Sequence, residues 1–178
     1  MQKNNFINSA LKVIQIEGKA ILGLQDQIEE TFNDLCLNII ATKGKLILMG
    51  IGKSGHIAQK ISATLSSTGT PSFFIHPTEA AHGDLGMVDK KDAILILSNS
   101  GETKEIIEIL PALKRCAGSI FTLTNNADST IAKIGDIHIL IKVNEEACPL
   151  DLAPTSSTTL ALVFGDALAV SLLEHRGF

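Results

Sequence analysis

The sequence contains no tryptophan and no tyrosine, so phenylalanine supplies all seven of its aromatic side chains. It also has no excess of basic residues, because 15 lysines and arginines are set against 19 aspartates and glutamates, for a net charge of −4. Proteins that bind nucleic acid use aromatic stacking platforms and a positively charged surface. Both are missing here, and we expect no nucleic acid partner.

Cysteine is scarce, and long apolar runs are absent. Cys36, Cys116 and Cys148 are odd in number and widely spaced, which argues against a disulfide framework and fits a reducing cytoplasm. No apolar run approaches the roughly 18 residues of a membrane span, and the first residues do not form a signal peptide. We therefore expect a cytoplasmic chain without a membrane partner. Its 178 residues suffice for one domain with a sizeable core.

Apolar runs alternate with helical patterns along the chain. Residues 4–42 have a helical pattern that Gly18 and Gly23 suggest is broken into two helices. The predicted strands cover residues 45–49, 72–75, 93–97, 119–124 and 137–143. After the first of these strands, a glycine-rich turn leads into a predicted helix that ends at about residue 66. Further helices are predicted over 104–115, over 128–133 with Asp128 or Asn126 as its N-cap, and from Pro154 to about residue 174.

This alternation of strands and helices predicts an α/β fold. We expect a doubly wound, mostly parallel five-stranded sheet with helices on both faces. Residues 1–178 would form a single domain, in which helices over 1–42 precede a sheet core and final helix over 43–178.

A polar run joins the predicted strand 93–97 to the predicted helix 104–115, and it reads Ser98-Asn99-Ser100-Gly101-Glu102-Thr103. Backbone N–H groups are unpaired at such a helix start, and the helix dipole favours negative charge there. An ordinary N-cap would need one hydroxyl. Three hydroxyls and a glycine favour a phosphate site over a simple cap.

A glycine-rich turn, residues 50–55, follows the first predicted strand. A P-loop is excluded because Ile47 stands where its first glycine would be. The G-x-G-x-x-G dinucleotide fingerprint does match, but the next strand leads into His76, where that site needs an acidic residue for the ribose. Dinucleotide binding is therefore a minor alternative. The turn places Ser54 at a helix N-terminus and Lys53 where it can meet a charged ligand.

Two histidines and two acids, His76, Glu79, His82 and Asp84, follow the second predicted strand. They could bind a metal or assist proton transfer. Within a helix, His76 and His82 would not share a face, so a substrate-lining role is favoured over a metal site. His138 lies inside the fifth predicted strand and is expected to be a packed core histidine.

Glu145 and Glu146 follow the fifth predicted strand, at the edge where open α/β sheets place their ligands. We expect at least one of them to be catalytic, with a solvated charged turn as the alternative. Pro154 is followed by five hydroxyl residues that open the final helix, more than one cap needs. Ser156 among them is a candidate ligand contact.

Taken together, these turns resemble the sugar isomerase (SIS) domain family over about residues 44–174. The run 98–103 is similar to that family's phosphate loop. Within the family, the arabinose 5-phosphate isomerases carry similar motifs, which match residues 52–56, 76–77 with 79–86, and 146–150 with 153–159. The phosphate loop alone is moderately specific for this family, whereas the whole set of motifs in this order is highly specific for it.

The resemblance implies an enzyme that interconverts D-ribulose 5-phosphate and D-arabinose 5-phosphate, an early step toward the Kdo sugar of lipopolysaccharide. It also implies a homotetramer with sites shared between subunits. The candidate catalytic residues are Lys53, Glu105, Glu146 and His82. The candidate contacts to the sugar phosphate are Ser54, Gly69, Thr70, His76, Ser98, Asn99, Ser100, Thr103 and Ser156. No cofactor is implied and no metal is required, although zinc could bind at His76 and His82 as an inhibitor.

The residue types suit this chemistry. Aldose–ketose isomerisation removes a proton alpha to a carbonyl, for which Glu146 is the chosen base. The enediolate that develops needs positive charge, for which Lys53 is placed. Ring opening needs an acid or base, and His82 or Glu105 could serve.

Two other functions remain as alternatives. An isomerase for a different sugar phosphate is disfavoured by the motif at 146–150. A non-catalytic sugar-phosphate or nucleotide-sugar sensor is the second alternative. Chains of the family continue past the final helix into a Ser-His-Pro-Gly-Gly segment and usually a paired CBS module. The sequence given stops at Phe178, so we expect an excised domain or a short relative.

Overall fold

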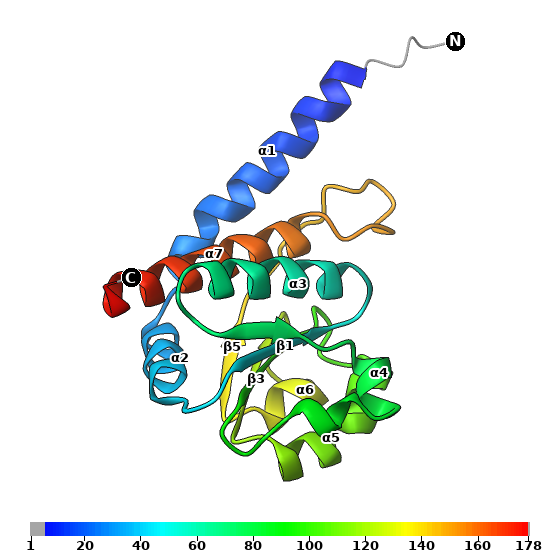
Figure 1. The fold of residues 1–178 in the computed structure, drawn as a ribbon. Helices are drawn as coiled ribbons and strands as arrows, with labels where there is room; N and C mark the ends of the chain where they lie inside the picture. The colour runs from blue at the N-terminus through cyan, green and yellow to red at the C-terminus, as the bar shows by residue number, and fades with distance from the viewer. Residues whose placement is uncertain (1–5, 178) are drawn as a thin grey trace.

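The computed structural model describes residues 6–177, in which parallel strands alternate with helices (Figure 1). The strands form a sheet of order β2–β1–β3–β4–β5. They are β1 (Leu46–Gly50), β2 (Ser72–Phe74), β3 (Ala93–Leu97), β4 (Ser119–Thr124) and β5 (Ile137–Leu140). All neighbouring strands pair in parallel, which confirms the predicted doubly wound five-stranded sheet. Residues 4 and 5, where the first helix was predicted to begin, lie outside the described residues.

The central strands are continuous apolar runs because helices cover both of their faces. Every residue of β1 and β3 is buried. Successive side chains point to opposite faces, so Leu46 and Leu48 enter one core while Ile47 and Met49 enter the other. β3 and β4 begin and end where predicted, whereas β1 begins one residue later and β2 ends one residue earlier.

The helices divide between the two faces. One face is covered by α1 (Phe6–Leu24), α2 (Glu30–Ala41), α3 (Gly52–Ser67) and α7 (Ser156–Arg176). The other is covered by α4 (Pro77–Ala81), the short 3₁₀ turn η2 (Asp84–Met87), α5 (Lys104–Cys116) and α6 (Thr130–Ile134). On the first face, the rings of Phe32 and Phe164 meet edge to face at 5.5 Å between centroids, which ties α2 to α7.

The predicted break in the N-terminal helical region is confirmed, and it follows Gly23. A 3₁₀ turn, η1 (Gln25–Gln27), separates α1 from α2, while Gly18 lies inside α1. The side chain of Gln27 accepts a hydrogen bond from Lys142 N at 2.7 Å and donates one to Lys142 O at 3.3 Å. The turn is thereby fixed to the backbone that follows β5.

Two predicted details of the C-terminal half are wrong. β5 was expected to reach residue 143 but ends at Leu140, because the Gln27 side chain occupies the backbone groups of Lys142. The short helix α6 begins at Thr130, and neither Asp128 nor Asn126 caps it. Ser129 Oγ accepts the hydrogen bond from Ala132 N at 3.3 Å. Asn126 instead accepts one from Asp128 N and forms a local turn.

α7 is the one helix within residues 6–177 whose length and mean hydropathy of 1.5 would allow a membrane span, whereas the sequence suggested no such segment. Leu160, Phe164, Leu168 and Leu172 of this helix are fully buried in the core. Their four-residue spacing places them on one face. Packing inside the fold therefore accounts for the apolar character of this side of α7.

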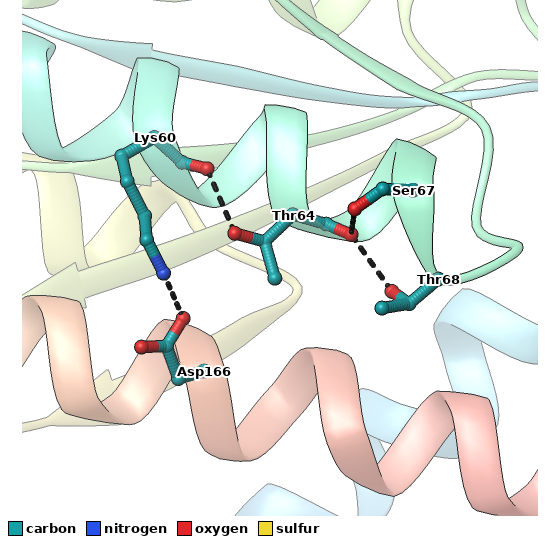
Figure 2. A network of polar contacts seen from close by, with 5 residues as sticks. All are labelled: Lys60, Thr64, Ser67, Thr68 and Asp166. Carbon is teal, nitrogen blue, oxygen red and sulfur yellow. Dashed lines mark hydrogen bonds and ion pairs between the residues drawn. The ribbon is translucent and has the colours of Figure 1, made fainter.

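α3 and α7 lie side by side (Figure 1) and are joined at their surface by an ion pair. Figure 2 shows Lys60 of α3 reaching Asp166 of α7, while the hydroxyls of Thr64, Ser67 and Thr68 bond to carbonyl groups of α3. Both charged side chains are 46% exposed. Such a pair contributes less than about 1 kcal/mol, so the buried apolar contacts hold the two helices together.

Candidate functional site

The site lies where two loops meet at the carboxyl edge of the sheet. β1 and β3 are neighbours, and the helices that follow them, α3 and α5, cover opposite faces. The chain therefore leaves the two strands in opposite directions. This is the switch point at which open α/β sheets bind ligands.

Glycines let the first of these loops turn tightly. A Cβ on Gly50 would lie 2.9 Å from the carbonyl of Ser54, and one on Gly55 would lie 2.7 Å from Gly50 O. The start of α3 therefore packs directly on the end of β1, which places Ser54 in the first turn of the helix.

The second loop, residues 98–103, is held by its own hydroxyls. Ser98 Oγ accepts a hydrogen bond from Gly101 N at 3.1 Å and lies 2.8 Å from Thr103 Oγ1. Ser100 Oγ accepts one from Glu102 N at 3.2 Å. Thr103 occupies the N-cap of α5, but its side chain makes no capping hydrogen bond. The positive end of this 13-residue helix faces the loop.

A small cavity of about 50 Å³ lies between the two loops and the start of α7. The hydroxyl and amide side chains that line it are those of Ser54, Ser98, Asn99, Thr124, Asn125, Ser157 and Thr158. Ser157 is buried beside the carboxylate of Glu146, and its hydroxyl helps to lower the pKa of that carboxyl.

Glu146 is the most highly connected of the predicted site residues. Its Oε2 accepts hydrogen bonds from Thr155 N at 2.7 Å, Thr155 Oγ1 at 2.9 Å and Ser157 N at 3.3 Å. Burial by itself raises the pKa of Glu146, but the hydroxyl and backbone N–H groups of Ser157 and Thr155 outweigh it, and the net pKa lies below the usual value. The carboxylate is therefore ionised at neutral pH, the state that a general base requires.

Glu146 also lines a larger cavity, of about 540 Å³, beside the small one. Asn99 lines both cavities, so the cavity at Glu146 reaches the loop 98–103 at this residue. Its remaining polar walls come from Lys12, Asn125, Asn144, Glu145, Cys148 and Asp151. Sequence patterns could not place Lys12 or Asn125 here, because folding alone brings α1 and the end of β4 to this edge.

Lys53, Glu105 and His82 are exposed, and none of their side chains makes a hydrogen bond or ion pair to another residue in the described range 6–177. Lys53 and Glu105 lie in the first turns of α3 and α5, respectively. Both helices begin at the same sheet edge. The structure therefore brings these two side chains to the loops, free to meet a ligand.

His76 and His82 lie at the two ends of α4. His76 is half-buried beside Phe74, and its Nδ1 accepts a hydrogen bond from Thr78 N at 3.3 Å, whereas His82 is the exposed C-cap residue. Within residues 6–177, no three His, Cys, Asp or Glu side chains converge as metal ligands. An inhibitory zinc at this histidine pair stays a prediction.

Three other predicted residues have different placements. Ser156 is fully buried at the start of α7, and its hydroxyl has no partner among the described residues. Gly69 and Thr70 follow α3 at the opposite, amino edge of the sheet, where Pro71 O accepts a hydrogen bond from Leu46 N at the start of β1. Within one chain, they do not join the other site residues.

His138 is a partly correct prediction. It is half-buried, as expected for a strand residue, and its Nε2 lies 2.9 Å from Thr124 Oγ1. Burial lowers its pKa. It also lines a separate cavity against α2, so it is not enclosed in the core.

Comparison with known proteins gives a family match over most of the chain. A model of the SIS domain matches residues 39–171. The arabinose 5-phosphate isomerase KdsD of Pseudomonas aeruginosa is 51% identical over 177 residues, which is 99% of this chain and 54% of that protein. KdsD of Escherichia coli K12 is 50% identical and covers 98% of this chain and 53% of that protein. The chain spans about half the length of these curated relatives.

A solved structure matches the chain over nearly all of both proteins. It is the Escherichia coli CFT073 protein c3406 in complex with arabinose 5-phosphate, which superposes with a TM-score of 0.95 at 43% identity. The match covers 100% of this chain and 95% of that one.

Proposed function

This chain belongs to the SIS domain family, and we propose that it is an aldose–ketose isomerase that interconverts D-ribulose 5-phosphate and D-arabinose 5-phosphate. The observation that carries this proposal is the placement of Glu146. Its ionised carboxylate opens into a cavity that Asn99 joins to the loop 98–103. The similarity to the KdsD isomerases and to a protein that binds arabinose 5-phosphate supports the choice of substrate.

The loop 98–103 would hold the phosphate at the start of α5. Ser100 and one hydroxyl of the Ser98–Thr103 pair would be the side-chain donors, because the other hydroxyl of that pair donates within it. Glu146 would then remove a proton from C1 of open-chain ribulose 5-phosphate, and the C1–H electron pair would become the C1–C2 double bond of the enediolate. A second proton moves from the O1 hydroxyl to O2, and return of the first proton to C2 then leaves the C1 aldehyde of arabinose 5-phosphate. The reaction redistributes two protons and two electrons within the substrate, so atoms and charge balance without a cofactor.

Lys53 is the residue we assign to the developing enediolate oxygen. It projects from the tight turn at the end of β1 and makes no ion pair within residues 6–177. A pre-positioned ammonium stabilises negative charge that forms only during the reaction. Glu105 or His82 would open and close the sugar ring, since both are exposed near the same edge.

A substrate panel tests the proposed reaction directly. The chain is incubated separately with ribulose 5-phosphate and with other ketose phosphates, and the products are identified by NMR. We expect arabinose 5-phosphate from ribulose 5-phosphate. Turnover of a different ketose phosphate alone would favour another isomerase, and saturable binding of arabinose 5-phosphate without turnover would favour a sensor.

We also propose a homotetramer with sites shared between subunits, in the cytoplasm, that supplies Kdo for lipopolysaccharide. Exposed apolar side chains on α1 support assembly, because Phe6 is 79% exposed and Ile14 and Leu22 are each 66% exposed. Gly69 and Thr70 add no support to shared sites, because Thr70 is buried at the amino edge of the sheet.

Replacing Ser100 with alanine tests the phosphate loop. We expect the Kd for arabinose 5-phosphate to rise about three- to tenfold, because one hydroxyl donor to the phosphate is lost, and kcat to change little. Calorimetry and steady-state kinetics measure the two effects. Ser67→Ala, which removes an exposed hydroxyl at the end of α3, is the control. Equal affinity in the Ser100 and Ser67 variants would show that the phosphate binds elsewhere.

The hydrogen bonds to Glu146 predict a pH dependence of stability. A carboxyl whose pKa is lowered by folding stabilises the protein above its unfolded pKa, and this contribution is lost as the pH falls through the folded value. The folded pKa of Glu146 lies below 4.5. We therefore expect the difference in unfolding free energy between wild type and Glu146→Gln to be constant from about pH 6 to 8 and to shrink below about pH 4. Urea titrations at several pH values measure it, and a difference that grows in acid would contradict it.

A further inference from the structure

The N-terminal helix contributes a charged side chain to the wall of the larger cavity. α1 extends beyond the rest of the fold (Figure 1), yet Lys12 and Ile16 both line the cavity that holds Glu146. These residues are four apart and so share one face of the helix. Gln15 and Lys19, on the neighbouring face, line an adjoining cavity that shares Ile16, Asn144 and Glu145 with the first but does not include Glu146.

Two contacts hold α1 in this position. Glu17 Oε2 accepts a hydrogen bond from Thr159 Oγ1 of α7 at 2.8 Å. At the end of α1, the two hydrogen bonds between Gln27 and Lys142 fix the following turn to the backbone after β5. Glu17 is the residue after Ile16, so the fixed point is next to the part of the helix that lines the cavity.

The charges around this cavity need a cation if an anionic ligand is to enter. Glu145, Glu146 and Asp151 contribute three carboxylates to its lining, whereas Lys12 is the one basic side chain there among the described residues. A sugar phosphate carries its negative charge on the phosphoryl group. Three carboxylates repel that charge, and a lysine in the same lining offsets the repulsion.

We propose that Lys12 binds the phosphoryl group of the substrate, so that α1 is part of the substrate site. This inference rests on the proposed function, and it adds a binding residue outside the motifs that carry the family resemblance. The ammonium would approach the phosphate from the side of α1 while the loop 98–103 holds it from the sheet. Lys12 would act in binding and leave the proton transfer to Glu146.

Lys12→Met tests this role, with Lys12→Arg and Lys19→Met as matched variants. Both positions are exposed on α1, and Lys19→Met causes the same change in charge on the neighbouring helix face. We expect Lys12→Met to raise the KM for ribulose 5-phosphate and the Kd for arabinose 5-phosphate about tenfold. The kcat should stay within about twofold of wild type, because Lys12 would bind the phosphoryl group equally well in the substrate and in the transition state. Inorganic phosphate should inhibit this variant about tenfold more weakly. Lys12→Arg should keep most of the affinity, and Lys19→Met should match wild type.

The outcomes separate this inference from the proposed reaction. If the Lys12→Met variant had the same KM and the same Kd as the Lys19→Met variant, the role of Lys12 would be overturned, even if the wild type is an active isomerase. A wild type that binds arabinose 5-phosphate but does not turn over would overturn the proposed reaction, and the ratio of Kd values would still decide on Lys12. A wild type that does not bind arabinose 5-phosphate would overturn both.

Discussion

Glu146→Gln is expected to reduce kcat for isomerisation by about 10²- to 10⁴-fold, the usual contribution of a general base. The amide cannot accept the substrate proton at neutral pH. Its carbonyl oxygen can still accept the hydrogen bonds that Thr155 donates to Glu146 at 2.7 and 2.9 Å. The fold and the phosphate loop should therefore survive, and the Kd for arabinose 5-phosphate should stay within about tenfold of wild type.

Glu145→Gln is the comparison that identifies the base. Glu145 is the adjacent carboxylate, lines the same cavity and is exposed, but it accepts no hydrogen bond from the start of α7. Its replacement should reduce kcat less than about tenfold. Kinetics and calorimetry on both variants decide the assignment, because the opposite order of losses would make Glu145 the base.

Gly101→Ala is expected to lower the free energy of unfolding by about 2–4 kcal/mol, from left-handed strain and steric overlap together. Gly101 has φ +69°. A Cβ at this position would overlap the side chain of Ser129, which is buried and caps α6. Because Gly101 N also donates to Ser98 Oγ, the loop cannot shift without losing its internal hydrogen bonds, and phosphate binding should weaken at least about tenfold.

Gly86→Ala provides the control for this variant. A Cβ on Gly86 would meet no atom within 4 Å, and the residue lies in the exposed turn η2. Urea denaturation should show a loss for Gly101→Ala several times larger than any change for Gly86→Ala. Similar stabilities would mean that the loop 98–103 is less rigidly built than its hydrogen bonds indicate.

The strands were largely predictable because their burial follows from local sequence. Ala93–Leu97 and Ser119–Thr124 are apolar runs with polar flanks, and both match the observed strands. β5 was misjudged because its end is set by Gln27, 115 residues away in sequence. The cap of α6 was misjudged for a local reason. Asn126, Asp128 and Ser129 can all cap a helix, and the sequence does not show which side chain the turn aims at Ala132.

The same distinction applies to the site. The motifs pointed to both loops and to Glu146, because hydroxyls, glycines and acids follow strands at the carboxyl edge. They did not indicate that Glu146 accepts hydrogen bonds from the start of α7, nine residues later in the chain. Lys12 lies in an ordinary amphipathic helix. Only the docking of α1 through Glu17 and Thr159 places it beside the cavity.

Solvent deuterium exchange tests most directly whether this chain moves a carbon-bound proton. Wild-type protein is incubated with ribulose 5-phosphate in D₂O, and the carbon-bound hydrogens are followed by NMR, with Glu146→Gln as the control. We expect deuterium to enter the substrate and arabinose 5-phosphate to form with wild type, and both to be slower by about 10²- to 10⁴-fold with the variant. Saturable binding of arabinose 5-phosphate by wild type without any deuterium incorporation would contradict an isomerase and indicate a sugar-phosphate sensor.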